Sequence, residues 1–179
     1  MHPEIEGFSI TAGNGSGTND AAAAVALVER AYADAEKLTV LATVKAWAAA
    51  GVAPRDTGLG AVKVIGKVLD RAGLKPSDVT LWEINEAFAS VPIAACREYG
   101  LDEELVNFSG SGCSLGHPIA ASGARMVTTL AYELQRRGGG IGVAAMCAGG
   151  GQAAPSSSRS SCDFGVMSDD ERNSSRRSH

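Results

Sequence analysis

Short apolar runs alternate with amphipathic stretches along most of the chain. Apolar β-branched runs predict strands at residues 38–44, 79–84 and 141–147. Apolar residues spaced by three or four positions predict helices at residues 59–72 and 121–137, each followed by glycine. Weaker patterns predict short strands at 8–12 and 105–108 and helices at 31–37 and 86–99. Strands that alternate with helices indicate an α/β fold, in which a sheet is covered by helices.

Two glycine-rich loops and one ambiguous apolar run complete the pattern. The loops span residues 13–17 and 109–116, where glycine allows positive φ angles and close approach of the backbone. The ambiguous run follows the first loop. Residues 21–24 fit the start of a helix capped by residues 18–20, whereas residues 25–28 are apolar on every side and also fit a buried strand. Periodicity alone does not distinguish the two.

The composition excludes several classes of protein. The 179 residues carry 16 Lys and Arg against 20 Asp and Glu, and a net charge of -4 leaves no basic excess for a nucleic-acid backbone. No apolar run approaches the roughly 20 residues of a membrane helix, and the N-terminus lacks the pattern of a signal peptide. The cysteines are irregularly spaced, with no CxxC pair: Cys96, Cys113, Cys147 and Cys162. We therefore expect a cytoplasmic protein with reduced thiols and with no nucleic-acid or membrane partner.

The composition changes sharply after Gln152. Residues 155–179 contain nine serines and four arginines with no apolar period, which predicts a disordered tail rich in serine and arginine. If one G is restored to GC-rich codons for residues 153–160, they encode Gly-Gly-Ala-Val-Leu-Val-Glu-Val, an apolar strand. We therefore interpret residues 153–179 as disordered, and hypothesise that they are an out-of-frame tail.

Three places at the ends of predicted elements carry side chains suited to chemistry. Asn85 follows the strand at 79–84, and Cys147 ends the strand at 141–147, just before three glycines. His117 lies between a glycine-rich loop and the longest helix. Singly, each has a simpler structural explanation, as a cap residue, a small buried thiol or a histidine satisfied within the fold. Together they offer a thiol beside exposed backbone N–H groups, a base and an amide donor, which suits an oxyanion intermediate.

The order and spacing of these residues resemble the C-terminal half of the thiolases, the acetyl-CoA acetyltransferases and 3-ketoacyl-CoA thiolases. The resemblance runs from residue 8 to residue 152 and rests on four ordered motifs: TAGNGSG at 11–17 with ND at 19–20, NEAF at 85–88, GHP at 116–118 with SGAR at 122–125, and CAGGG at 147–151. It implies that residues 1–37 end the thiolase N-terminal domain and contain a loop that contacts CoA. Residues 38–152 are then the thiolase C-terminal domain, with a mixed sheet under helices.

The resemblance implies roles for five residues. His117 is expected to deprotonate a nucleophilic cysteine and to donate a hydrogen bond to a thioester oxyanion. Asn85 is expected to hold a water in the first oxyanion hole, and the backbone amide of Gly149 to help form the second. Cys147 is expected to move the proton on the α-carbon of the substrate, and Ser16 to contact the pantetheine arm of CoA.

The implied activity is acyl transfer between CoA thioesters, either thiolytic cleavage of a 3-ketoacyl-CoA or Claisen condensation of acyl-CoA. No cofactor and no metal are implied, because the CoA thioesters are themselves the substrates. The implied partners are acyl-CoA or CoA, and either a thiolase N-terminal half or further copies in a homo-oligomer, which is a dimer or tetramer in the family. The GSG form of the loop at 109–114 resembles degradative thiolases more than many biosynthetic ones.

Two departures from the family pattern bear on activity. Thiolases are longer, and their nucleophilic cysteine lies in the N-terminal half; neither Cys96 nor Cys113 matches its motif. After Gln152 the family has a final apolar strand that closes the sheet, which residues 153–160 do not match. Three interpretations follow: a thiolase or its C-terminal portion, a ketosynthase, or a catalytically inactive truncated or frameshifted fragment. A ketosynthase is disfavoured because it would have a histidine in place of Cys147.

Overall fold

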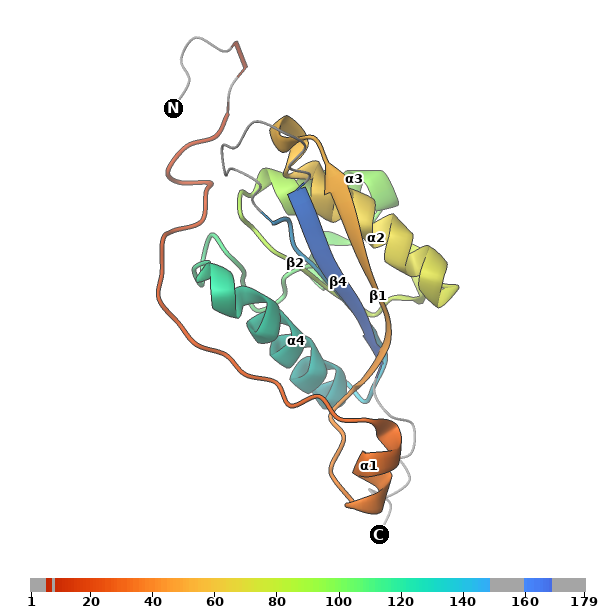
Figure 1. Ribbon diagram of the computed structural model, residues 1–179. Helices are drawn as coiled ribbons and strands as arrows, with labels where there is room; N and C mark the ends of the chain where they lie inside the picture. Colours follow the sequence, from red (N-terminus) through yellow and green to blue (C-terminus); the bar gives the residue numbers. More distant parts are fainter. Residues whose placement is uncertain (1–5, 8, 149–159, 169–179) are drawn as a thin grey trace.

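The fold is a four-stranded sheet between helices (Figure 1), in a computed structural model that describes residues 6–7, 9–148 and 160–168. The strand order is β1-β4-β3-β2. The strands are β1 (Thr43–Val52), β2 (Leu81–Ile84), β3 (Ile141–Ala145) and β4 (Ser160–Ser168). The helices are α1 (Arg30–Ala35), α2 (Leu59–Ala72), α3 (Ser90–Tyr99) and α4 (Ile119–Arg136), with short 3-10 turns at Pro54–Asp56, Pro76–Asp78 and Glu103–Leu105.

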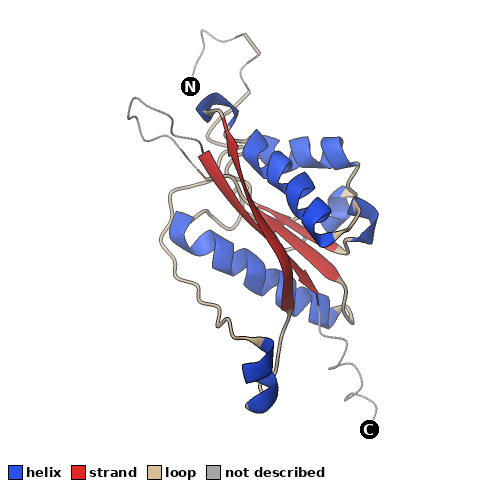
Figure 2. Ribbon diagram, turned by 45° about the vertical axis from the view of Figure 1, so that its right-hand side comes forward, coloured by secondary structure: helices blue, strands red, loops and turns tan. Residues whose placement is uncertain are grey.

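Helices cover both faces of the sheet (Figure 2). On one face α2 packs against β1 and β4 and contacts α3, and on the opposite face α4 packs against β2 and β3. β2 and β3 run parallel, whereas β4 runs antiparallel to both β1 and β3. The sheet is therefore mixed and covered by helices. This confirms the α/β class that the alternation of strands and helices predicts.

The structure corrects the expected disorder of residues 153–179 at one place. Ser160–Ser168 forms β4, which lies inside the sheet with β1 on one side and β3 on the other. Gly165, for example, is opposite both Trp47 and Ala144. A strand between two neighbours gains hydrogen bonds along both of its edges, so pairing compensates for the weak apolar pattern of this stretch. The rest of residues 153–179 lies outside the described residues.

The longer predicted elements are present, with shifted ends. The helix predicted at 59–72 is confirmed as α2, and α4 begins at Ile119, slightly before its predicted start. β1 begins only at Thr43 and includes an alanine-rich run, which pairing with β4 and packing against α2 hold in an extended form. The helix predicted from residue 86 begins at Ser90, because Phe88 just before it forms an antiparallel bridge with Gly15.

Several short elements that the sequence predicts do not form in the described residues. Residues 21–28 are neither helix nor strand, and run extended past α4 (Figure 1). Residues 9–12 form no strand. Of the strand predicted at 105–108, the structure retains a single parallel bridge between Val106 and Trp82. Short apolar runs lack the length that makes a periodic pattern reliable, so tertiary contacts decide their conformation.

The core consists of two apolar clusters, one on each face of the sheet. The larger lies under α2 and includes Val64 and Trp82, and the smaller lies under α4 and includes Leu81 and Leu130. Leu81 and Trp82 belong to different clusters because side chains alternate along a strand. Both faces of β2 are thus buried, which explains its nearly continuous apolar sequence. The same burial makes the carboxylate of Glu83, in the middle of β2, unusual.

Substitution of the two tryptophans, one buried and one exposed, would test where the core lies. Trp82 is 2% exposed, whereas Trp47 on β1 is 68% exposed. We expect Trp82→Ala to lower the free energy of unfolding by about 3–5 kcal/mol, because it leaves a cavity. Trp47→Ala, the control, should lower it by about 1 kcal/mol or less, the value of its contact with the Arg71 guanidinium. Urea denaturation followed by circular dichroism measures both variants, and equal losses would contradict this core.

Candidate active site

The candidate site lies at the edge of the sheet where β2 and β3 both end. These strands are parallel, with Ile84 opposite Ala145, and the backbone N–H of Asn85 donates to the carbonyl of Ala145 at 2.9 Å. The segments that follow the two strands therefore leave the sheet side by side. In α/β proteins this region, beyond the carboxyl ends of parallel strands, is where ligands bind.

Asn85 and His117 are in contact at this edge. The side-chain Nδ2 of Asn85 is 3.3 Å from His117 Nε2 and 3.5 Å from Nδ1, although the residues are 32 positions apart. Nδ1 of the same ring is 2.7 Å from the hydroxyl oxygen of Ser122 in α4. The structure thus brings together two of the five predicted site residues and adds Ser122 as a third group.

The hydrogen bonds of Ser122 indicate which ring nitrogen of His117 carries the proton. The Ser122 hydroxyl donates to the carbonyl of Pro118 at 3.2 Å, so its oxygen accepts from Nδ1–H. The amide of Asn85 is a donor and faces Nε2, the nitrogen with the free lone pair. Burial, and then the charge of Arg125, lower the pKa of His117 from its ordinary value. The imidazole is therefore neutral at neutral pH, as a general base must be.

The Asn85 side chain retains an unused acceptor. Asn85 is 0% exposed, and its Oδ1 has no hydrogen-bond partner among the described residues. A buried amide oxygen without a partner costs free energy, and folded proteins contain few such groups. The acceptor is therefore available to a substrate atom or a water at the sheet edge.

One N-terminal loop connects the two motifs of the site. The backbone N–H of Ser16 donates to the carbonyl of Ala87 at 3.0 Å, which places the loop beside the NEAF motif. Three residues further on, the side-chain oxygen of Asn19 accepts from the backbone N–H of His117 at 3.0 Å. The loop therefore positions Ser16, the predicted CoA contact, on the same side of the molecule as Asn85 and His117.

The glycine-rich loop at 109–116 packs directly on the segment after β2. The Cys113 N–H donates to a carboxylate oxygen of Glu86 at 3.0 Å, and the Ser111 hydroxyl oxygen accepts from the Glu86 N–H at 3.4 Å. A Cβ atom at Gly112 would lie 2.4 Å from the carbonyl oxygen of Glu86. Glycine is required at this position because two backbones approach each other without room for a side chain.

Cys147 follows β3 at the same edge of the sheet. Cys147 is buried, and it belongs to the apolar cluster under α2. Gly149, the predicted amide donor of the second oxyanion hole, lies outside the described residues. Of the five predicted site residues, the structure therefore describes four and places them at or beside one edge of the sheet.

Two other described cysteines, Cys96 and Cys113, have free thiols. Burial, and then the charge of Glu103, raise the pKa of Cys96. Burial, and then the charge of Glu86, raise the pKa of Cys113. A raised pKa leaves less thiolate at neutral pH, which disfavours both thiols as nucleophiles.

Three polar residues near His117 received no role from the sequence: Ser122, Arg125 and Glu83. Glu83 Oε2 is 2.5 Å from Arg125 Nη1. Burial raises the pKa of Glu83 to about 7, although Arg125 acts to lower it. Ser122 and Arg125 belong to the SGAR motif at 122–125, which indicates the family but gives neither residue a role, and Glu83 is a single carboxylate in an apolar strand.

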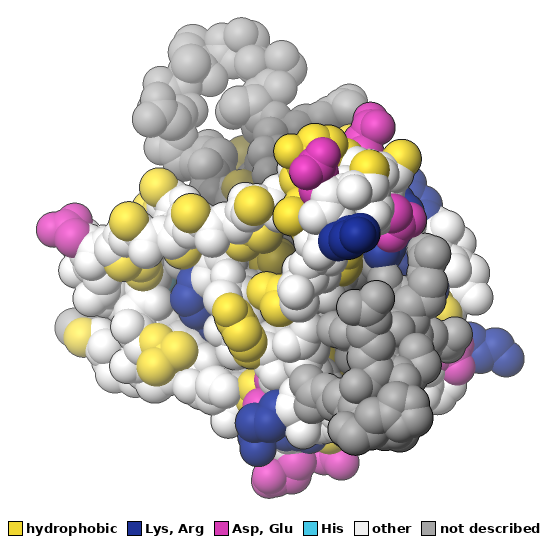
Figure 3. Space-filling model, turned by 90° about the horizontal axis from the view of Figure 1, so that it is seen from below, with side chains coloured by type: hydrophobic (Ala, Val, Ile, Leu, Met, Phe, Trp, Pro, Cys, Tyr) yellow, Lys and Arg dark blue, Asp and Glu magenta, His cyan; other side chains and the backbone are white. Residues whose placement is uncertain are grey.

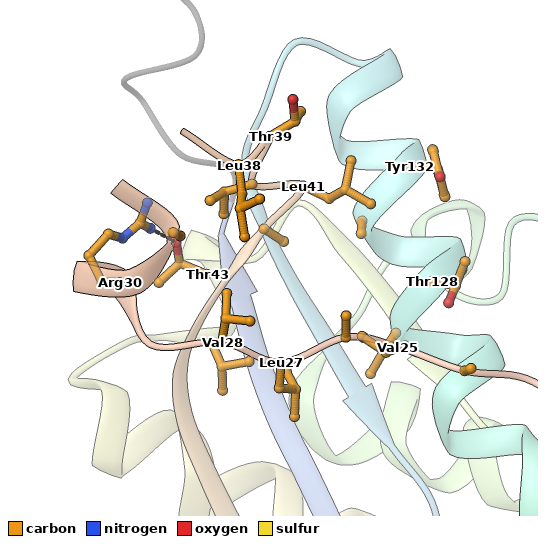
Figure 4. A pocket seen from close by; sticks show the side chains of 18 residues that line it. Val25, Leu27, Val28, Arg30, Leu38, Thr39, Leu41, Thr43, Thr128 and Tyr132 are labelled. Atoms are coloured by element: carbon orange, nitrogen blue, oxygen red, sulfur yellow. Dashed lines mark hydrogen bonds between the residues drawn. The ribbon is translucent and has the colours of Figure 1, made fainter. Parts of the chain in front are cut away.

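A separate hollow of about 590 Å³ lies between residues 24–28, residues 38–44 and α4 (Figure 4). Its lining is largely apolar, and at one end the Arg30 guanidinium donates to the hydroxyl of Thr43 at 2.5 Å. Apolar side chains such as Leu27 are exposed there, and Figure 3 shows others on the face seen from below. None of the described site residues lines this hollow.

Two features of other protein classes are absent from the described part of the chain. There, no helix combines the length and the apolar character needed to cross a membrane. In the same residues, no three side chains of the His, Cys, Asp and Glu types gather as ligands of a metal would.

Comparison with known proteins identifies the family. Residues 38–157 match the family model described as "Thiolase, C-terminal domain". This chain belongs to the thiolase family. It is 46% identical over 143 residues to the cytosolic acetyl-CoA acetyltransferase of Mus musculus, and 45% identical over 146 residues to the 3-ketoacyl-CoA thiolase of Bacillus subtilis (strain 168). The resemblance that the four motifs indicate is thus confirmed.

This thiolase chain is much shorter than its relatives. The two matches cover 80% and 82% of the chain but 36% and 37% of the relatives. The structure of the Bacillus anthracis acetyl-CoA acetyltransferase matches with a TM-score of 0.82 and 38% identity, covering 90% of this chain and 39% of that one. Human mitochondrial 3-ketoacyl-CoA thiolase in complex with CoA matches with a TM-score of 0.77 and 32% identity, covering 90% and 38%.

Two glycines test the close packing around the site. In Gly112→Ala the new methyl group would overlap the backbone of Glu86, so we expect a loss of about 1–3 kcal/mol in the free energy of unfolding. Gly123 in α4 is the control, since its nearest neighbour is Met146 Sδ at 3.6 Å. Gly123→Ala should gain about 0.5–1 kcal/mol from helix propensity. Urea denaturation measures the free energy of unfolding of both variants. A Gly112→Ala variant as stable as the wild type would refute the close approach of the Gly112 and Glu86 backbones.

Proposed function

We propose that this thiolase-family chain supplies the C-terminal half of an acyltransferase active site that acts on CoA thioesters. The reaction is thiolytic cleavage of a 3-ketoacyl-CoA, or the reverse Claisen condensation of acyl-CoA. The observation that carries the proposal is the contact between Asn85 and a neutral His117 at the ends of β2 and β3. The relatives named acetyl-CoA acetyltransferase and 3-ketoacyl-CoA thiolase support it.

In this proposal His117 is the base that deprotonates a nucleophilic thiol. Ser122 holds the Nδ1 proton, so the lone pair on Nε2 takes the proton of the thiol. The resulting thiolate attacks the thioester carbonyl, and the carbonyl electrons move to its oxygen. The protonated Nε2 then becomes a hydrogen-bond donor to an oxyanion, and its lowered pKa makes it a ready acid for the leaving group.

Asn85, Gly149 and Cys147 complete the proposed chemistry. The Asn85 amide lies beside Nε2, so the two groups offer converging N–H donors to an oxyanion or to a water that bonds to it. The backbone N–H of Gly149 is proposed as a donor to the second thioester oxygen. The Cys147 thiolate takes the proton from the substrate α-carbon, which leaves an enolate, and the thiol returns that proton in the cleavage direction.

Ser16 is the proposed contact to the pantetheine arm of CoA. Its support is the bond from its backbone to Ala87, which holds the loop next to the NEAF motif. Human mitochondrial 3-ketoacyl-CoA thiolase, a relative by structure, is solved in complex with CoA. A cytosolic acetyl-CoA acetyltransferase among the relatives supports the proposed cytoplasmic location.

We further propose that the chain lacks the nucleophilic cysteine and depends on a thiolase N-terminal half, with homo-oligomers of the assembled enzyme as in the family. The support is the raised pKa of both Cys96 and Cys113, together with matches that span 36% of the cytosolic relative. The same observations favour a second candidate, a catalytically inactive fragment. The two differ in whether an N-terminal half restores turnover.

The isolated chain should not turn over acetoacetyl-CoA. Covalent acyl transfer needs a cysteine that forms an acyl-enzyme, and a raised pKa disfavours both described candidates. The assay mixes purified chain with acetoacetyl-CoA and CoA and follows the loss of enolate absorbance. Turnover that Cys96→Ala or Cys113→Ala abolishes would reveal a substitute nucleophile and overturn the proposal. Turnover that appears only after a separately expressed N-terminal half is added would identify a split enzyme rather than an inactive fragment.

Within a full-length reconstruction, His117→Ala should cost more activity than Ser16→Ala. Loss of a general base lowers the rate by about 10²–10⁴-fold, and His117 is also an oxyanion donor in the proposal. Ser16→Ala removes a contact made equally in the ground and transition states, so it should raise KM for CoA and leave kcat nearly unchanged. Steady-state thiolysis kinetics separate the two effects. A His117→Ala enzyme with wild-type kcat would remove His117 from the mechanism.

A further inference from the structure

An ion pair between a buried carboxylate and a half-buried guanidinium lies next to the proposed catalytic imidazole. Glu83 in β2 is 0% exposed, and its Oε2 is 2.5 Å from Nη1 of Arg125 in α4. The other carboxylate oxygen of Glu83 and Nη2 of Arg125 have no hydrogen-bond partner among the described residues. A buried ion pair is often no more stabilising than a well-packed apolar pair of the same size. Stability alone therefore does not explain why β2 and α4 carry these two charges.

The ion pair runs alongside the contact between Asn85 and His117. Glu83 and Asn85 are two positions apart along the line of β2, so both face α4. Ser122 and Arg125 are three positions apart in α4, so they share one side of the helix. β2 and α4 are thus joined by two neighbouring polar bridges, the ion pair and the chain of contacts through His117.

The charged group that acts on the imidazole is Arg125 in α4, which is paired with Glu83 in β2. Arg125 lowers the pKa of His117, after burial, which is the larger cause. Burial raises the pKa of Glu83 to about 7, with Arg125 opposing the shift and Glu86 adding to it. When Glu83 takes up a proton as the pH falls, the charge of Arg125 is no longer balanced. The positive charge of Arg125 then opposes protonation of the His117 imidazole more strongly.

We propose that Glu83 and Arg125 are a positioning pair for His117. They hold α4 against β2, so that Ser122 fixes the imidazole ring beside Asn85, and they place a cation near the ring that favours its neutral form. The pair touches no reacting atom, and it acts through the orientation and charge of His117. The catalytic meaning of this inference rests on the proposed function, but the ring position and its titration are properties of the chain alone.

The effect of charge is tested by titrating the His117 ring. The chain has 3 histidines, two of them near its ends, and a His117→Gln variant identifies the ring signals in nuclear magnetic resonance spectra. Arg125→Met should raise the titration midpoint of His117 by roughly 0.5–1 pH unit, and Arg125→Lys, which keeps the charge, should retain the wild-type midpoint. Arg136→Met is the matched control, because Arg136 pairs with Glu133 near the C-terminal end of α4, and should cause no shift.

The position of the ring is tested by replacing the ion pair with two apolar side chains. Glu83→Leu combined with Arg125→Met leaves no unpaired buried charge, so the chain should stay folded with an unfolding midpoint near that of the wild type. We expect loss of the nuclear Overhauser signal between the Asn85 side-chain amide and the His117 ring, whose nitrogens are 3.3 Å apart. Glu133→Gln, which removes a carboxylate from another ion pair of α4, should keep that signal.

The outcomes separate this inference from the proposed function. A folded double variant that keeps both the Overhauser signal and the wild-type midpoint of His117 would overturn the positioning role. If the double variant does not fold, the single variants decide: equal midpoints in Arg125→Met and Arg125→Lys overturn the role, and a higher midpoint in Arg125→Met alone supports it. These measurements need no turnover. A reconstituted enzyme without activity would therefore count against the proposed function. The measurements on the His117 ring would still decide whether Glu83 and Arg125 position it.

Discussion

The site depends on the last hydrogen bond between β2 and β3, from the Asn85 N–H to the Ala145 carbonyl. It fixes the point at which both strands end. Because parallel strands present their carboxyl ends at one edge, this bond aligns the NEAF motif with the segment that contains Cys147. A slip of one residue in the register would turn every side chain of β2 to the other face. Asn85 would then face α2 instead of α4, and its contact with His117 would be lost.

Beyond that edge, hydrogen bonds and close backbone approach position the site. The two apolar clusters pack the helices on the sheet but do not specify where the outer loops lie. Ser16 bonds to Ala87 and Asn19 to His117, so one loop holds both motifs, while the approach at Gly112 fixes a second loop. Polar contacts are directional, which suits a site whose groups must hold a defined geometry. The only carboxylate in β2 lies on the face where this polar network meets the smaller cluster.

The sequence predicts the fold class, the helix α2 and the family, and the family motifs single out Asn85 and His117. The fold class, α2 and the family are confirmed, because long periodic runs and ordered motifs are strong local signals. The roles of Asn85 and His117 stay predictions, although the structure brings their side chains into contact. The sequence does not predict β4, since that strand is stabilised by neighbours on both sides rather than by its own pattern. It also gives no role to Ser122 or Arg125. Helix periodicity puts them on one side of α4, but only the packing of α4 on β2 shows that this side faces Asn85.

Because β4 lies inside the sheet, some parts of the structure depend on the tail more than others do. The resemblance leads one to expect a final strand directly after Gln152, whereas the sheet takes Ser160–Ser168 into its interior. Among the described residues β1 pairs with β4 alone, so β1 needs β4 to join the sheet, whereas α2, which packs on β1 and β4, also contacts β3 and α3. β2 pairs directly with β3, and α4 packs directly on both strands, so these contacts do not require β4. A change in the tail should therefore disturb Cys147, which lies in the cluster under α2, more than the contact between Asn85 and His117.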